Sequence, residues 1–154
     1  MTLAQTIKNW GPAESVRRNH ALEHATIQVL SENQKGLRLA GISDMRGFWI
    51  LGDLDIEELA DAIEDARRRL NNGESQLAIH PNCGTNLATA GVIGGFFAWV
   101  AMLGVGKTWQ EKLERLPVLF ALVSMGLIIA QPLGPKIQQN LTTEAHLGSL
   151  HVTS

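Results

Sequence analysis

The stretch Asn86–Gly106 reads NLATAGVIGGFFAWVAMLGVG and decides how the chain is organised. It carries no charged side chain and is long enough to cross a lipid bilayer as a helix. A second uncharged stretch, Leu116–Pro135 (LPVLFALVSMGLIIAQPLGP), lies between Arg115 and Lys136. Two core helices of a soluble protein would have a similar composition, but a chain of 154 residues has little other material to cover them. The sequence therefore predicts a transmembrane helical hairpin over residues 86–135.

The flanks of this hairpin bear on its membrane orientation. The connecting segment Lys107–Arg115 has charges of both signs and includes Trp109, whose amphipathic ring suits a membrane interface. Both ends of a hairpin lie on one side of the membrane, so we expect the preceding region and the tail 136–154 to share a compartment. The chain has one cysteine, and residues 1–10 lack the pattern of a secretory signal. We therefore expect an integral protein of the bacterial inner membrane, in contact with the lipid bilayer, with its N-terminal domain in the cytoplasm.

Charged residues are scarce in this chain. Hydrophobic residues make up 45% and charged residues 18%, with a formal net charge of -2. Because there is no basic tract beyond Arg67–Arg69, we expect no nucleic-acid partner. The single cysteine, Cys83, excludes a disulfide within the chain and is either a buried thiol or a metal ligand.

Residues 1–85 read as a small α+β domain before the hairpin. The apolar pattern predicts a helix at 12–32, strands at 37–42 and 48–51 joined by a turn, a helix with Asp55 as N-cap and Glu58 as its capping-box partner, and a strand at 76–80. Residues 71–73 end the second helix, and the end of the tail, 150–152, could return as a further strand. The expected fold is a helix–strand–strand–helix–strand domain plus the transmembrane helical hairpin.

The first predicted helix contains His20–His24 (HALEH), the pattern H-x-x-E-H. Residues three and four apart on a helix share a face, so His20, Glu23 and His24 converge. Two imidazoles at this spacing can bind Zn²⁺, and the carboxylate beside them can move a proton. A structural pair of helix histidines is the alternative, but the preceding residues 17–19 (RRN) make this stretch more polar than a core helix.

A third ligand is expected, because catalytic zinc usually has three protein ligands and one water. The candidates lie in residues 80–84 (HPNCG), which precede the first membrane span. Thiolate and imidazole both suit zinc, and we favour Cys83, with His80 as the alternative third or fourth ligand. A carboxylate such as Asp53 or Glu57 is the remaining choice. The structural alternatives are a buried thiol and a strand-end histidine bonded to backbone.

The motif at residues 20–24 resembles that of two inverzincin families, the pitrilysin-type metallopeptidases and S-ribosylhomocysteinase. In the latter family, two helix histidines and a later cysteine followed by glycine bind the metal, and the matching residues are His20, His24 and Cys83. In both families the motif glutamate, here Glu23, transfers protons. This chain lacks the lyase's second cysteine and is too small to form the chamber of the pitrilysins, so the resemblance implies the metal site and the proton-transfer role of Glu23 rather than the lyase reaction.

The whole chain also resembles an uncharacterised family of small bacterial two-span membrane proteins. Members carry RNHALEHAT near the N-terminus and HPNCGTNL before a membrane hairpin, which match residues 18–26 and 80–87. This resemblance implies the two-part architecture and no particular activity.

These features together predict a membrane-anchored zinc-dependent hydrolase, a metallopeptidase, in which Glu23 activates a metal-bound water. Iron is the alternative metal, and the substrate would be a membrane-protein or peptide segment. The alternative function is a non-catalytic membrane assembly factor or scaffold with a structural metal site, and a third interpretation has no metal. The small residues of the first span suggest a homo-oligomer.

Overall fold

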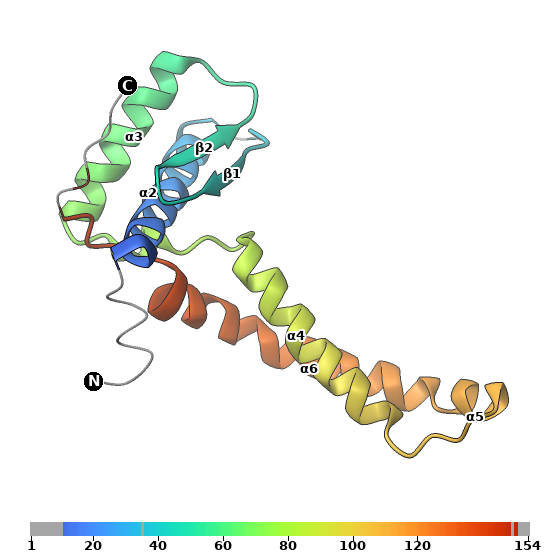
Figure 1. The fold of residues 1–154 in the computed structure, drawn as a ribbon. Coiled ribbons are helices and arrows are strands. Elements are labelled where there is room, and N and C mark those ends of the chain that lie inside the picture. Colours follow the sequence, from blue (N-terminus) through green and yellow to red (C-terminus); the bar gives the residue numbers. More distant parts are fainter. Residues whose placement is uncertain (1–10, 35, 149, 151–154) are drawn as a thin grey trace. The chain divides into compact units, whose positions relative to one another are not determined.

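The computed structural model describes residues 11–34, 36–148 and 150, and its elements are labelled in Figure 1. Two compact units divide the chain: Met1–His80 with Gln138–Ser154 form the first, and Pro81–Ile137 the second. The architecture is α+β, as expected, with helices in both units and a small sheet in the first.

Two helices, α2 (Gly11–Asn33) and α3 (Ile56–Asn71), form the framework of the first unit. Both lie where the apolar periodicity predicts them. Their buried side chains form one cluster with those of η1 and the tail: Ala21, Leu22, Ala25, Val29, Leu30, Ala62, Ala66, Leu70, Leu77, Ala78 and Leu147. Full burial of one leucine side chain contributes roughly 1.5–3 kcal/mol, so this cluster is the main source of the unit's stability.

The start and end of α3 follow from its sequence. Asp55 is the N-cap, and its carboxylate accepts a hydrogen bond from the Glu57 N–H at 3.2 Å. The predicted capping box is wrong, because the Glu58 carboxylate instead accepts a hydrogen bond from the Gln34 side chain at 2.8 Å. After the helix, Gly73 adopts a φ of +96°, which favours glycine and ends the helix as predicted.

The sheet is a hairpin of β1 (Ala40–Ser43) and β2 (Phe48–Leu51). The strands are antiparallel, with Ala40 opposite Leu51. One face of the hairpin is half-buried and the other is exposed. Within the described residues the sheet has these two strands alone.

A turn at Asp44 joins the strands and fastens them to α2. The Asp44 carboxylate accepts hydrogen bonds from the backbone N–H groups of Arg46 and Gly47, at 2.6 and 3.1 Å. The buried side chain of Asn19 donates to the Asp44 carbonyl at 2.8 Å. The hairpin is therefore bonded to the helix that bears the H-x-x-E-H motif.

The segment after α3 is a turn of 3₁₀ helix, η1 (Ser75–Ala78), so the third strand predicted at 76–80 is wrong. Its carbonyl groups are occupied by a side chain of α2: Gln28 donates to Leu77 and Ile79, at 2.8 and 3.0 Å. A strand would pair these carbonyls with a neighbouring strand, whereas here a helix supplies the donor. Of the tail strand predicted at 150–152, residue 150 is described and is not in a strand, and the other two lie outside the described residues.

The chain returns to the first unit as η2 (Gln138–Thr142), a turn of π-helix. The guanidinium of Arg17 on α2 donates to the Thr143 carbonyl at 2.9 Å and to the Glu144 carboxylate at 3.1 Å. The Arg17 carbonyl accepts a hydrogen bond from the Glu144 N–H at 3.0 Å. These bonds pair one terminal nitrogen of a buried cation, whose Nε has no partner among the described residues. They make the start of the tail an integral part of this unit.

The second unit contains α4 (Gly84–Met102), the short α5 (Trp109–Glu114) and α6 (Leu116–Ile137). Two helices, Gly84–Met102 and Leu116–Thr142, are long and apolar enough to span a membrane, with mean hydropathies of 1.4 and 2.0. Within their apolar windows 17% and 11% of the residues are buried. So much exposed apolar surface is typical of helices that face lipid and unlike the core helices of a soluble protein.

Small residues line the contact between α4 and α6, which run side by side in Figure 1. The buried residues are Thr89, Gly94 and Ala101 on α4 and Gly126, Ala130 and Gly134 on α6. A Cβ added at Gly126 would lie 2.8 Å from a ring carbon of Phe97. The four-residue spacing on α6 places its small residues on one face and lets the backbones approach closely.

The connection between these helices is held by polar contacts. Thr108 and Glu111 form a capping box at the start of α5, and the hydrogen bonds from Thr108 lower the pKa of the Glu111 carboxyl. Arg115 donates through Nε to the Ala101 carbonyl at 2.9 Å, which satisfies a carbonyl in the last turn of α4.

Candidate metal centre

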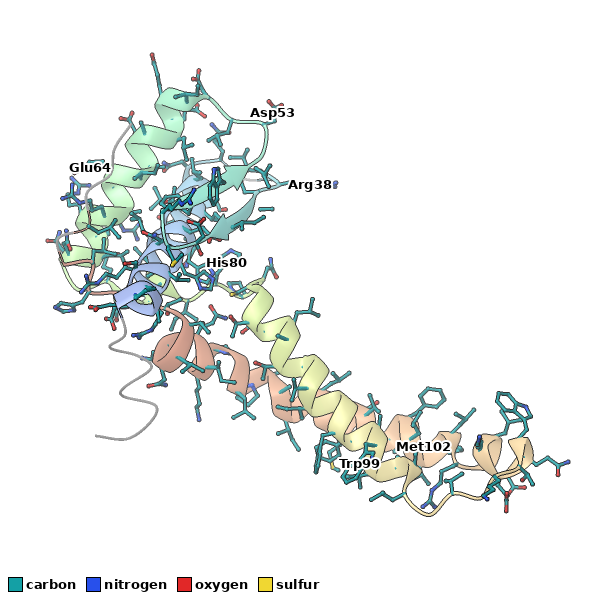
Figure 2. The ribbon with its side chains drawn as sticks, in the orientation of Figure 1. Arg38, Asp53, Glu64, His80, Trp99 and Met102 are labelled. Carbon is teal, nitrogen blue, oxygen red and sulfur yellow. The ribbon has the colours of Figure 1, made fainter. Side chains whose placement is uncertain are left out.

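The H-x-x-E-H histidines lie on one face of α2, as their spacing predicts. The rings of His20 and His24 meet edge to face, with centroids 4.3 Å apart. His80 brings a third imidazole, whose centroid is 5.6 Å from that of His24 (Figure 2). The first unit therefore gathers three histidine rings, two from α2 and one from the segment after η1.

Backbone carbonyl groups hold the two helix histidines. His20 Nδ1 bonds to the Thr142 carbonyl oxygen at 3.0 Å, and His24 Nδ1 to that of Ala78 at 2.8 Å. A carbonyl oxygen can only accept, so the geometry assigns the proton to Nδ1 in both rings. In the neutral rings the lone pair is then on Nε2, the usual arrangement of metal-binding histidines.

Glu23 lies on the same turn of α2 with its side chain 4% exposed. Among the described residues this carboxylate has no hydrogen-bond or ion-pair partner. Its oxygens are not among the fully buried polar atoms that lack a partner, which are Nε of Arg17 and of Arg18. Gly41 of β1 makes room for this side chain, because a Cβ at position 41 would collide with the Glu23 carboxyl group.

The backbone of His80 is fixed by Gln138, whose side chain is fully buried. The Gln138 amide oxygen accepts from the His80 N–H at 2.9 Å, and the amide nitrogen donates to the His80 carbonyl at 3.0 Å. These two bonds join the residue where the chain leaves the first unit to the residue where it returns.

Cys83 is the N-cap of α4 in the second unit, and its Sγ accepts a hydrogen bond from the Thr85 N–H at 3.4 Å. It is a buried free cysteine. Two residues separate it from His80, so the chain keeps the two Cα atoms within about 11 Å. The alternative ligands Asp53 and Glu57 are exposed, and Figure 2 shows Asp53 on the loop after β2, away from His80.

Three residues of this site could not be identified from the sequence: Gly41, Gln138 and Thr142. Gln138 and Thr142 belong to the polar run QQNLTT, residues 138–143, directly after the apolar stretch of α6. A polar run in that place ordinarily indicates a solvated flank. Its contribution to the histidine site depends on a fold that brings Gln138 to His80, 58 positions away, and Thr142 to His20, 122 positions away.

Comparisons with known proteins identify a family. The family described as a domain of unknown function (DUF6391) matches residues 15–154. An uncharacterized protein of Picosynechococcus sp. (strain ATCC 27264 / PCC 7002 / PR-6) is 35% identical over 142 residues, which cover 83% of this chain and 65% of that protein. The chain thus spans slightly less than two thirds of this relative's length. No solved structure matches the chain. Because the family match includes every residue of the candidate site, the chain that carries this site belongs to the DUF6391 family.

Proposed function

We propose that the protein is a membrane-anchored zinc-dependent hydrolase, a metallopeptidase, in which Glu23 transfers the proton. The observation that carries this proposal is the pair of Nδ1–carbonyl hydrogen bonds made by His20 and His24. They direct the two remaining lone pairs to Nε2, on the helix face that also bears a buried carboxylate. Metal-binding histidines usually donate their other ring N–H to a carbonyl or carboxylate in this way, which supports the proposal.

His20, His24 and Cys83 are the proposed ligands. Each offers one atom of a kind that binds metal ions. Two imidazole nitrogens and one thiolate sulfur form a donor set that suits zinc, with iron as the alternative. A thiolate at Cys83 is supported by the N-terminal end of α4, where the helix dipole stabilises negative charge.

When bound, zinc would supply a Lewis acid that makes a water molecule more acidic than bulk water. The Glu23 carboxylate takes a proton from the water that attacks the substrate carbonyl carbon. It then returns the proton to the leaving amine nitrogen as the carbon–nitrogen bond breaks. Gly41 keeps this carboxylate in place, because it leaves space where a larger residue would displace the Glu23 side chain.

The proposal places α4 and α6 in the bacterial inner membrane, with the first unit in the cytoplasm. The length, hydropathy and exposed apolar residues of these helices support membrane insertion. A free cysteine supports a reducing compartment for the site. Since the first unit is tethered to both helices, the fitting substrate is a membrane-protein or peptide segment close to the bilayer. The protein is also expected to form a homo-oligomer.

A structural metal site is the second candidate, and one observation favours it. The His80 ring lies 5.6 Å from that of His24, so a fourth protein ligand is within the same cluster. Four protein ligands would leave no position for water, and metal binding would then contribute folding free energy. The protein would in that case be a membrane assembly factor or scaffold.

The test is metal analysis of the full-length protein in detergent, with the Co²⁺-loaded form examined by absorption spectroscopy. A single site predicts about one zinc per chain in the wild type. The zinc should be lost in His20→Ala and in Cys83→Ser. The matched control is His146→Ala, because this histidine is exposed in the tail. A thiolate-to-cobalt charge-transfer band that disappears in Cys83→Ser would identify the sulfur ligand.

Two further variants separate the candidate functions. Glu23→Gln should keep the metal and lose hydrolysis of a fluorogenic peptide, by about 10²- to 10⁴-fold, as for removal of a general base. Metal content that falls in His80→Ala would favour the structural site. An absence of metal from the wild type after reconstitution with zinc or iron would overturn both.

A further inference from the structure

The β1–β2 hairpin has an exposed face that is entirely apolar. Ile42, Trp49 and Leu51 on this face are 60%, 55% and 58% exposed. The register places Ile42 directly opposite Trp49, and Ala40 opposite Leu51. Met45, in the turn between the strands, is 59% exposed and extends the same apolar patch. We call these five residues the hairpin patch.

The apolar composition of the hairpin patch is unusual for a sheet face exposed to water. An antiparallel sheet with one solvated face ordinarily alternates apolar residues inside with polar residues outside. Here the inner positions of β2, Phe48 and Ile50, are also apolar and pack against the core of the first unit. Both faces of the hairpin therefore need an apolar environment, and the fold of the first unit supplies one to the inner face alone.

The arginines of the hairpin also differ from their neighbours. Five arginines of the first unit form ion pairs with acidic side chains: Arg17, Arg18, Arg67, Arg68 and Arg69. Arg38, just before β1, and Arg46, in the turn, form none with the described residues, and both are exposed. Asp44 and Asp53 balance their charge, so the hairpin is neutral overall. Its binding would thus depend on its apolar side chains.

We propose that the hairpin patch inserts into the headgroup region of the lipid bilayer. The inference rests on the proposed membrane anchoring: three residues join His80 to α4, and α6 runs directly into Gln138. If α4 and α6 cross the bilayer, the first unit cannot leave its surface. A tryptophan suits the interface, and long arginine side chains can extend from an apolar patch to the phosphate layer.

A second copy of the chain is the less favoured occupant. A stable protein–protein interface buries about 800 Å² on each partner. Four large side chains, each partly buried already, offer well below that area. A bilayer has no such requirement, because its apolar layer accepts single side chains.

The test uses the full-length protein in phosphatidylcholine vesicles, with phosphatidylcholine brominated on its acyl chains as the quencher. A variant with Trp10, Trp99 and Trp109 changed to Phe keeps Trp49 as its one fluorophore. The matched control carries Glu64→Trp at an exposed position of α3, and all four of its native tryptophans are changed to Phe. We expect emission from Trp49 to shift to shorter wavelength, to be quenched by the brominated lipid and to resist iodide, while the probe at position 64 behaves in the opposite way.

Two results would overturn the inference. Trp49 could be quenched by iodide as fully as the control probe, which would place the patch in water. Alternatively, Trp49 could resist both quenchers, which would place the patch against protein, as in a dimer. A third variant that keeps Trp99, exposed on α4, tests the anchoring separately. Quenching of Trp99 by brominated lipid without quenching of Trp49 would defeat this inference and leave the membrane anchor intact.

Discussion

The two units of this chain distribute apolar residues in opposite ways. The first unit buries large side chains such as Leu22 and exposes charged ones, so the hydrophobic effect stabilises it. The second exposes large side chains such as Phe96 and Ile128 and buries glycines such as Gly126. In lipid an exposed apolar side chain costs nothing, and close backbone contact becomes the source of stability. The comparison shows that the same residue types stabilise one unit from inside and suit the other from outside.

The largest expected effect comes from exchanging apolar side chains for alanine in the two units. Leu22→Ala removes a fully buried side chain and should destabilise the first unit by about 3 kcal/mol, as for other buried leucines. Phe96→Ala removes a larger side chain that is 56% exposed, and should change stability far less. Unfolding of both variants in lipid nanodiscs, followed by amide hydrogen exchange, would measure the difference. Equal destabilisation would contradict the contrast between the units.

Within the first unit, Gly41 is expected to act on the chemistry rather than on the core. Gly41→Ala places a methyl group where the Glu23 carboxyl lies, and a displaced catalytic group can cost about 100-fold in rate. The metal content should stay unchanged. Gly47→Ala is the control, because a Cβ there meets nothing within 4 Å. Both variants are checked by measuring the hydrolysis of a fluorogenic peptide together with the zinc content. Equal rates of hydrolysis in Gly41→Ala and Gly47→Ala would show that Gly41 has no part in the mechanism.

Gly126→Leu tests the packing inside the second unit. The added side chain would collide with Phe97 and should destabilise the α4–α6 pair by about 1–3 kcal/mol, the usual cost of overpacking. Gly91→Leu on α4 is the matched control, since a Cβ there meets nothing within 4 Å. Thermal unfolding in detergent compares the two. A destabilising Gly91→Leu would reveal a contact of α4 beyond α6, such as that of a homo-oligomer.

The smallest expected effect is a pH dependence confined to α5. Hydrogen bonds from Thr108 lower the pKa of Glu111 below its ordinary value of 4.5. The stabilisation by the capping box is therefore fully present above pH 4.5 and is lost as the pH falls through the lowered pKa of Glu111 in the folded state. The protection of the Glu111 amide against exchange, corrected for the intrinsic rate at each pH, should fall on acidification. Glu111→Gln, which keeps a capping side chain, should remove this dependence. Glu114→Gln in the same helix should leave it unchanged.

The sequence predicted the elements whose signals are local. The periodicity of α2 and α3, the N-cap at Asp55 and a turn between two strands are all patterns of neighbouring residues, and the structure confirms them. The bounds of the first strand differ, because it was predicted at 37–42 and lies at Ala40–Ser43, so Ser43 belongs to the strand and not to the turn. The contact between the His20 and His24 rings also follows from their spacing on one helix. The two apolar stretches were readable from hydropathy, and the structure contains two helices long and apolar enough to span a membrane.

The predictions that failed depended on partners distant in the sequence. Residues 76–80 have the composition of a strand, but Gln28 supplies donors to their carbonyls and no strand forms. Glu58 has the spacing of a capping box, but Gln34 competes for its carboxylate. The roles of Gln138 and Thr142 in the histidine site have the same origin. Such contacts are set by tertiary packing, which no local pattern contains.

The hydrogen bond between His20 and the Thr142 carbonyl also has a consequence for the order of events during synthesis. The ribosome makes His20 early, but the carbonyl that orients its ring emerges 122 residues later, after both apolar helices. Gln138, which holds His80, also follows both apolar helices. A nascent chain therefore has His20 and His80 but not the groups that hold them until the second unit has been translated, whereas the Ala78 carbonyl that orients His24 is made earlier. Maturation of the site is thereby timed to follow the synthesis of the helices proposed to anchor it.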